Sequence, residues 1–180
     1  MRSMILLLAV IAPSLAFGDI EKVGSPTEHG LQLRWWPRMM LADGWYHDAD
    51  VSMVNGVNMI VPEGSTFADA ESVIYARAIY KPRDPDVTSI NILIARDKTG
   101  AAEHSPGVRI SDASPVEIAD GTKLQTLTFF PEHQGNWERI AYGEDGDFYL
   151  MFAVSSRTKE GFEAAELAYE EMIRSYTREP

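Results

Sequence analysis

The stretch FYLMFAVSSRTKEGFEAAELAYEEMIRSY, residues 148–176, carries the clearest structural signals in the chain. Its first part, Phe148 to Val154, is a continuous apolar run, which is typical of a central strand covered on both faces. Thr158 then suits a helix N-cap. Apolar side chains recur after it at helical spacing, at Phe162, Ala165, Tyr169, Met172, Ile173 and Tyr176. The stretch therefore predicts a buried strand followed by an amphipathic helix that packs on a sheet.

The residues just before this stretch contain further β signals. Strands are expected at 108–113, 124–130 and 137–144, with turns between them. The last of these strands is joined to residues 148–155 through Asp145-Gly146. An Asp-Gly pair favours the left-handed backbone angles of a tight hairpin turn, so the two strands should be antiparallel neighbours.

The first half of the chain begins with a strand expected at 31–36, which Pro37 ends. A hairpin is expected from residues 50–54 and 57–61, because they flank Asn55-Gly56. Residues 38–49, between these strands, are expected to be irregular.

Two helices are expected to follow. Thr66 and Asp69 resemble a capping box, and the apolar spacing after them predicts a helix at 67–80. Residues 88–103 fit a helix or a strand, and helix is favoured. Residues 31–180 are thus expected to form a single α+β domain with a mostly antiparallel sheet of six to seven strands.

The N-terminus resembles a cleavable secretory signal over residues 1–18. Arg2 precedes the apolar run 5–11, and small residues allow cleavage after Ala16 or Gly18. Pro13 interrupts the run well below the ~20 apolar residues of a membrane span. Residues 19–30, which are polar and contain glycine and proline, are expected to form a flexible N-terminal segment. The predicted location is the bacterial periplasm, with the extracellular medium as the alternative.

Composition narrows the possible functions. The chain has no cysteine, which excludes disulfides, thiol catalysis and thiolate metal sites. The net charge is −11, and removal of Arg2 with the leader would make it −12. An acidic surface repels phosphate backbones and anionic lipids, so nucleic acid and membranes are unfavourable partners. Another exported or envelope protein is the expected partner, and the sequence leaves the oligomeric state open.

The order of elements resembles a known family. The features are a strand near Trp35, Val61-Pro62-Glu63-Gly64 after a hairpin, two helices, Trp137-Glu138-Arg139-Ile140-Ala141-Tyr142 in a meander, and the final strand and helix. Together they resemble the PsbP-like (Mog/PsbP/DcrB-type) α/β/α sandwich of small exported bacterial proteins, over about residues 31–177. The resemblance implies helices on both faces of the sheet and a non-catalytic binding, assembly or accessory role. It provides no catalytic residue, because the family has no common catalytic motif.

Motifs for chemistry are absent from the sequence. It contains no Gly-x-Ser-x-Gly, no His-Glu-x-x-His and no glycine-rich phosphate loop, so no enzyme activity and no cofactor are predicted. The densest set of metal ligands is His47, Asp48 and Asp50. In an extended segment the two aspartates would point the same way and could hold a hard cation. The alternative is a polar loop that leads into a strand.

The aromatic residues suggest a binding surface instead. One short segment contains Trp35, Trp36, Met39, Met40, Trp45 and Tyr46, and residues of these types are enriched in interface cores. Adjacent tryptophans in a strand point to opposite faces, so one of them needs cover from helices or from a partner. The leading hypothesis is an exported non-catalytic binding or accessory protein. The alternatives are an immunity or inhibitor protein against a secreted toxin or enzyme, and a metal-dependent or carboxylate hydrolase.

Overall fold

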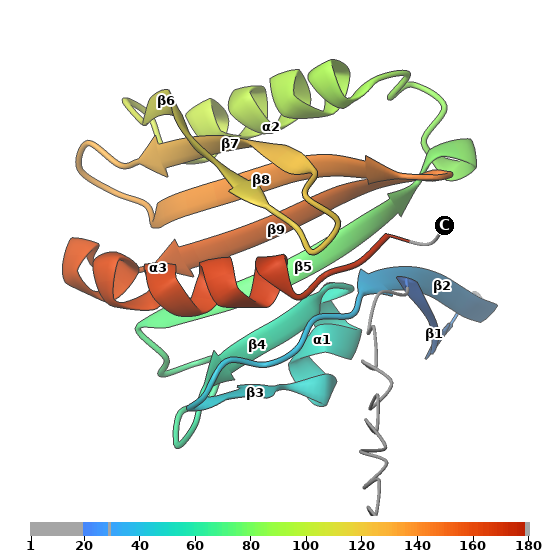
Figure 1. Cartoon of the computed structure of the whole chain (residues 1–180), viewed down its shortest axis with the longest axis horizontal. Helices are drawn as coiled ribbons and strands as arrows, with labels where there is room; N and C mark the ends of the chain where they lie inside the picture. Colours follow the sequence, from blue (N-terminus) through green and yellow to red (C-terminus); the bar gives the residue numbers. More distant parts are fainter. Residues whose placement is uncertain (1–19, 29, 179–180) are drawn as a thin grey trace, which may run out of the picture.

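The computed structural model describes residues 20–28 and 30–178. These form an α+β domain built on one antiparallel sheet, with the strand order β1-β2-β5-β9-β8-β7-β6 and with β4 and β3 attached beside β5 (Figure 1). The strands are β1 (Ile20–Thr27), β2 (Gly30–Pro37), β3 (Trp45–His47), β4 (Asn58–Pro62), β5 (Ser72–Tyr80), β6 (Arg109–Glu117), β7 (Lys123–Phe130), β8 (Trp137–Asp145) and β9 (Phe148–Ser156). The helices are α1 (Ala49–Asn55), α2 (Ile90–His104) and α3 (Lys159–Arg174), with a 3-10 turn, η1 (Lys81–Arg83). The predicted leader, residues 1–18, lies outside the described residues.

The predicted central strand is confirmed. β9 pairs with β5 on one side and with β8 on the other. Alternate residues of β9 belong to two different hydrophobic clusters. One cluster contains Leu150, Phe152 and Val154 with the apolar stripe of α3, and the other contains Tyr149, Met151 and Ala153 with Leu93 and Ile94 of α2. The continuous apolar run is therefore needed because both faces of β9 are buried.

The final helix also forms as its sequence predicts. The Thr158 hydroxyl accepts a hydrogen bond from the Gly161 amide at 3.0 Å and caps α3. The predicted apolar stripe, from Phe162 to Tyr176, is buried. At the end of the helix, the Tyr176 hydroxyl donates to the Asp145 carboxylate at 2.6 Å. This buried contact attaches the C-terminal end of α3 to the turn between β8 and β9.

The other strands of the second half, the strand at 31–36 and the helix at 88–103 are confirmed as β6, β7, β8, β2 and α2. The expected β8–β9 hairpin forms, but its turn residues are Gly146 and Asp147, because Asp145 still pairs with Phe148. Among the described residues, no helix is both long and apolar enough to span a membrane.

The hairpin expected at 50–54 and 57–61 is wrong in its first strand. Residues 49–55 form α1, which the Asp48 carboxylate caps by accepting from the Val51 amide at 3.1 Å. Gly56 ends this helix in the left-handed conformation, with φ of +69°. Asn-Gly suits a hairpin turn and a helix C-terminus for the same reason, which is the left-handed backbone that both require. Only residues 58–62 form the expected strand, β4.

The helix expected at 67–80 is also wrong. Asp69 accepts hydrogen bonds from the Thr66 amide and hydroxyl, but the resulting turn does not continue into a helix. Residues 72–80 instead form β5, which pairs with β9 along its whole length. The apolar spacing that resembled a helix is the alternation of a strand inside the sheet, where pairing on both edges outweighs local propensity.

Two further strands were not expected. β1 occupies most of the segment predicted to be flexible, 19–30, and pairs with β2 over its length. β3 occupies residues 45–47 within the region expected to be irregular, and pairs with β4. With β5, these additions raise the sheet from the predicted six to seven strands to nine among the described residues.

Candidate functional site

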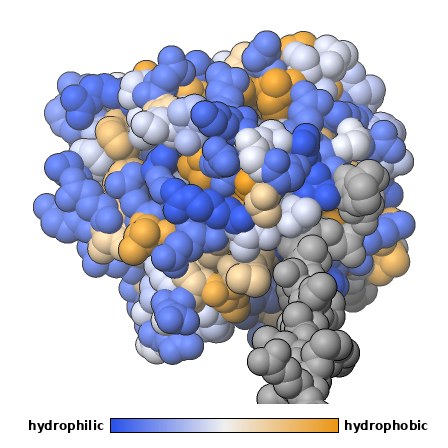
Figure 2. Space-filling view, viewed as in Figure 1, coloured by the Kyte–Doolittle hydropathy of each residue, from blue (hydrophilic) through white to orange (hydrophobic). Residues whose placement is uncertain are grey.

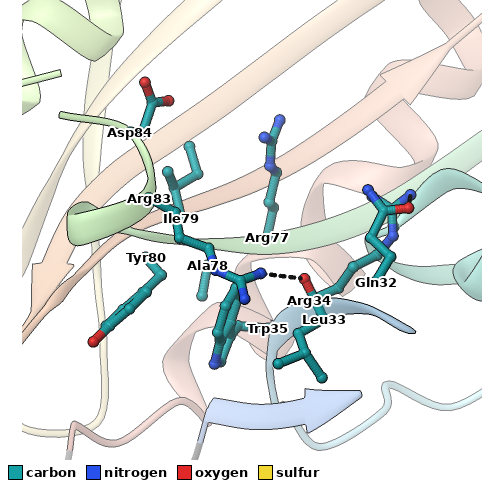
Figure 3. A pocket seen from close by; sticks show the side chains of 11 residues that line it. Gln32, Leu33, Arg34, Trp35, Arg77, Ala78, Ile79, Tyr80, Arg83 and Asp84 are labelled. Carbon is teal, nitrogen blue, oxygen red and sulfur yellow. Dashed lines mark hydrogen bonds between the residues drawn. The ribbon is translucent and has the colours of Figure 1, made fainter. Parts of the chain in front are cut away.

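One edge of β5 is shared by two strands that separate from each other. β4 pairs with β5 at residues 74–76, whereas β2 reaches β5 through the Cα pair Trp35 and Ala78. A cavity of about 260 Å³ lies at this fork (Figure 3). We call it the arginine pocket, and its lining residues are Gln32, Leu33, Arg34, Trp35, Gly56, Arg77, Ala78, Ile79, Tyr80, Arg83 and Asp84.

Arg34 projects from β2 onto the end of α1. Its Nη2 donates to the Gln32 side chain at 3.2 Å. Its guanidinium lies directly over Gly56, where a Cβ atom would be only 1.8 Å from Nη1. No residue in the last turn of α1 is basic, so Arg34 provides the cation that favours a helix C-terminus. The buried Nε atom of Arg34 has no hydrogen-bond partner among the described residues.

Arg77 is the one charged residue of the segment 73–80 and lies across the pocket from Arg34 (Figure 3). Desolvation and the nearby charges of Arg96 and Arg34 lower the pKa of Arg77. Arg96 is itself held by Asp84, with 2.8 Å between Nη1 and Oδ2. The acidic residue of the pocket is thus already paired with an arginine outside it.

Arg83 and a group of aromatic rings form the remaining wall. The Arg83 guanidinium lies 4.9 Å from the Trp35 ring centroid and donates to the Leu33 carbonyl at 3.4 Å. Trp35 in turn contacts Tyr80, with 5.1 Å between ring centroids. These contacts hold Arg83 over an aromatic surface, and no carboxylate in the described part of the chain forms an ion pair with it.

The pocket concentrates positive charge in an acidic protein. Within the described part of the chain, Arg34, Arg77 and Arg83 form no ion pair with a carboxylate, although the net charge of the chain is −11. Guanidinium groups bind carboxylates and phosphates through paired hydrogen bonds. The arrangement can therefore hold an anionic ligand, or the anionic group of a cofactor.

The six residues of the predicted partner-binding segment do not form one exposed patch. Trp36 is buried, and Trp35 is half-buried in the wall of the arginine pocket. Trp45 and Met39 are half-buried against the cluster that includes α3. Tyr46 donates to the Ser65 carbonyl at 2.8 Å, and Met40 is 58% exposed. Figure 2 shows a face that is mostly hydrophilic, with small separate hydrophobic patches.

The predicted metal ligands are placed differently from the expectation. Asp48 caps α1 and Asp50 lies in its first turn, so the two carboxylates do not alternate along an extended strand. His47 Nε2 lies 2.9 Å from the Ser52 hydroxyl. Across residues 20–28 and 30–178, no group of three or more histidine, aspartate or glutamate side chains is arranged to hold a metal ion.

Sequence reasoning missed the arginine pocket because its residues are far apart in the chain and follow no motif. One signal was present. Arg77 interrupts an apolar run in a strand inside the sheet, and its side chain is exposed there. That signal depends on recognising residues 72–80 as a strand.

No protein-family profile matches the chain, and no curated protein matches its sequence. One solved structure with a similar fold is a protein of unknown function, PA94, from Pseudomonas aeruginosa, described as a proposed regulator. The two are 14% identical, with a TM-score of 0.50, and the match covers 88% of this chain and 98% of that chain. At this identity the similarity concerns the fold alone.

Proposed function

We propose that this protein is an exported, non-catalytic binding or accessory protein of the PsbP-like α/β/α sandwich type, and that it binds an anionic group in the arginine pocket. The observation that carries the proposal is that three arginines line one cavity and form no ion pair with a carboxylate among the described residues. Arg34 lies over the end of α1, Arg77 projects from β5, and Arg83 lies over the Trp35 ring.

Two physical arguments support an anion in this place. The nearby positive charges of Arg34 and Arg96 lower the pKa of Arg77, and a bound anion would relieve this repulsion. A carboxylate or phosphate could also accept paired hydrogen bonds from an arginine guanidinium that lines the pocket. The cavity is large enough for a carboxylate or phosphate together with a small attached group.

The hydrolase alternative is not favoured by these observations, because Asp48 already serves as a helix cap. The immunity or inhibitor alternative remains a second proposal. It is supported by the net charge of −11, which would attract a basic partner to the surface outside the pocket.

The test is calorimetric titration of the mature protein with phosphate, sulfate, acetate and citrate at constant ionic strength. We expect Arg34→Gln and Arg77→Gln each to weaken anion binding about ten-fold or more, because charge-assisted hydrogen bonds are lost. Arg109→Gln is the matched control, since it removes the same charge from the exposed start of β6, at the opposite end of the sheet. Absence of binding, or an equal loss in all three variants, would refute the proposal.

A further inference from the structure

Asp97 is a carboxyl group on the packed face of α2, outside the arginine pocket. It follows Leu93 and Ile94, the two buried residues of the helix, by four and three positions, so it shares their face toward the sheet. Its Oδ2 atom is buried and has no hydrogen-bond partner among the described residues. A carboxylate in such a position is unfavourable, because its charge loses contact with water.

The sheet beneath α2 connects Asp97 to the arginine pocket. Arg77 on β5 pairs with Met151 on β9, and Met151 pairs in turn with Tyr142 on β8. Residues that pair directly lie on the same face, so these three side chains form one row across the sheet. Met151 and Tyr142 belong to the hydrophobic cluster that contains the buried residues of α2. The row therefore runs from the pocket to the part of the sheet that α2 covers.

The charged and titratable groups around Asp97 come from three elements: Tyr142 and Glu138 of β8, Tyr75 and Arg77 of β5, and Arg96 of α2. Desolvation raises the pKa of Asp97, and the Tyr142 hydroxyl and the charges of Arg96 and Arg77 lower it by less. Desolvation also raises the pKa of Glu138, and the charge of Asp97 adds to this effect. Of this set, Arg77 is the residue that also lines the arginine pocket.

Arg77 is thus placed to interact with two negative charges. Its guanidinium favours the ionised form of Asp97 from one side and faces the cavity on the other. An anion bound beside Arg77 would disfavour ionisation of Asp97, because a like charge nearby favours the neutral form of a carboxyl group. Linkage is reciprocal, so protonation of Asp97 must strengthen anion binding by the same factor.

We propose that anion binding in the arginine pocket is coupled to protonation of Asp97, so that the protein binds its anionic ligand more tightly as the pH falls. This inference rests on the proposed anion-binding function. Two strand spacings, roughly 10 Å, separate Arg77 from Tyr142 along the row. A divalent anion and a carboxylate at about that distance repel each other enough, even at the dielectric constant of water, to change the affinity about four-fold.

The experiment is a calorimetric titration with sulfate at pH 5 and pH 8, at one low ionic strength. Sulfate stays divalent over this range, so a change in affinity reports titration of the protein alone. We expect wild-type protein to bind sulfate about four-fold or more tightly at pH 5 than at pH 8. Asp97→Asn should bind at pH 8 as tightly as the wild type does at pH 5, with no further change between the two. Asp112→Asn, which removes the same charge from an exposed position of β6, is the matched control and should keep the wild-type pH dependence.

A proton count gives a readout that a purely structural role of Asp97 would not change. The titration is repeated at intermediate pH in buffers of different ionisation enthalpy, and the slope of the measured heat gives the protons taken up for each sulfate bound. Wild-type protein should take up a fraction of a proton, and Asp97→Asn should take up none. Tyr142→Phe should move the change in affinity to higher pH, because the Tyr142 hydroxyl lowers the pKa of Asp97.

The outcomes separate this coupling from the proposed function. Sulfate binding that is sensitive to Arg77→Gln but independent of pH would overturn the coupling and leave the anion site intact. A pH dependence that persists in Asp97→Asn, or tighter binding at pH 8, would do the same. Absence of sulfate binding at both pH values would overturn the proposed function and the coupling with it.

Discussion

Gly56 connects the fold to the arginine pocket, and Gly56→Ala tests that connection. Gly56 has φ of +69°, and a Cβ atom there would lie 1.8 Å from Nη1 and 2.2 Å from Cζ of Arg34. The left-handed backbone costs alanine about 1–2 kcal/mol. The clash itself adds little to this, because a guanidinium at the end of a flexible side chain can move away. Its movement, however, removes Arg34 from the pocket.

Gly64→Ala is the matched control, because Gly64 has φ of +81° and no atom within 4 Å of the added Cβ. Both variants should lose about 1–2 kcal/mol of unfolding free energy in urea, which is about 2–8 °C in Tm for a domain of this size. Only Gly56→Ala should weaken phosphate binding, by about ten-fold, as expected for a lost charge-assisted contact. Wild-type affinity in Gly56→Ala, or an equal loss in Gly64→Ala, would refute the account of Arg34.

Three further predictions concern stability, measured by urea or thermal unfolding. Gly161→Ala should lower the unfolding free energy by about 1–3 kcal/mol, because the added Cβ would lie 2.6 Å from the Ser156 hydroxyl. Gly100→Ala, which has open space around it in α2, should raise the unfolding free energy by about 0.5–1 kcal/mol. The reverse order of stabilities would contradict this packing. Arg139→Ala should lower the unfolding free energy by about 2–4 kcal/mol, because this buried arginine donates to two glutamates of α3 at 2.8 and 3.2 Å. A loss below about 1 kcal/mol would show that the ion pairs contribute little to stability. Asp97→Asn should raise the unfolding free energy by about 1–2 kcal/mol at pH 7 and change it little at pH 4. Desolvation raises the pKa of Asp97, so the wild type loses stability as the pH rises from the ordinary carboxyl range through the folded pKa. An effect of the substitution that does not depend on pH would contradict this.

The sequence predicts the second half of the fold well because its signals have one interpretation. The apolar run of β9 and the stripe of α3 match the burial that the structure shows. The segment around Gly146 predicts a hairpin turn without an alternative, since strong β patterns lie on both sides. In these elements local propensity and tertiary packing favour the same structure.

The first half misleads because its local signals fit two structures. Asn55-Gly56 fits a hairpin turn or a helix end, and the Asp48 cap, eight residues before Gly56, favours the helix. The segment of β5 has apolar spacing that fits a helix, and only its pairing with β9 excludes one. Such pairing joins residues 68 to 84 positions apart, which no local pattern reveals.

The candidate site was beyond sequence reasoning for the same physical reason. The sequence predicts a partner-binding role for Trp36 and Met39, and in the structure both line a cavity. The arginines meet only because β2 and β4 diverge along one edge of β5. Their charges are ordinary in the sequence and become significant only when the fork brings them together.

The fork also gives the β1–β2 hairpin a degree of independence from the rest of the sheet. The two strands pair with each other along their lengths, but the hairpin is joined to β5 at one Cα pair. A ligand that contacts Arg34 on β2 together with Arg77 on β5 would form a second connection between the β1–β2 hairpin and β5. Ligand binding would then slow amide hydrogen exchange throughout the β1–β2 hairpin, although the ligand contacts the hairpin at one end only.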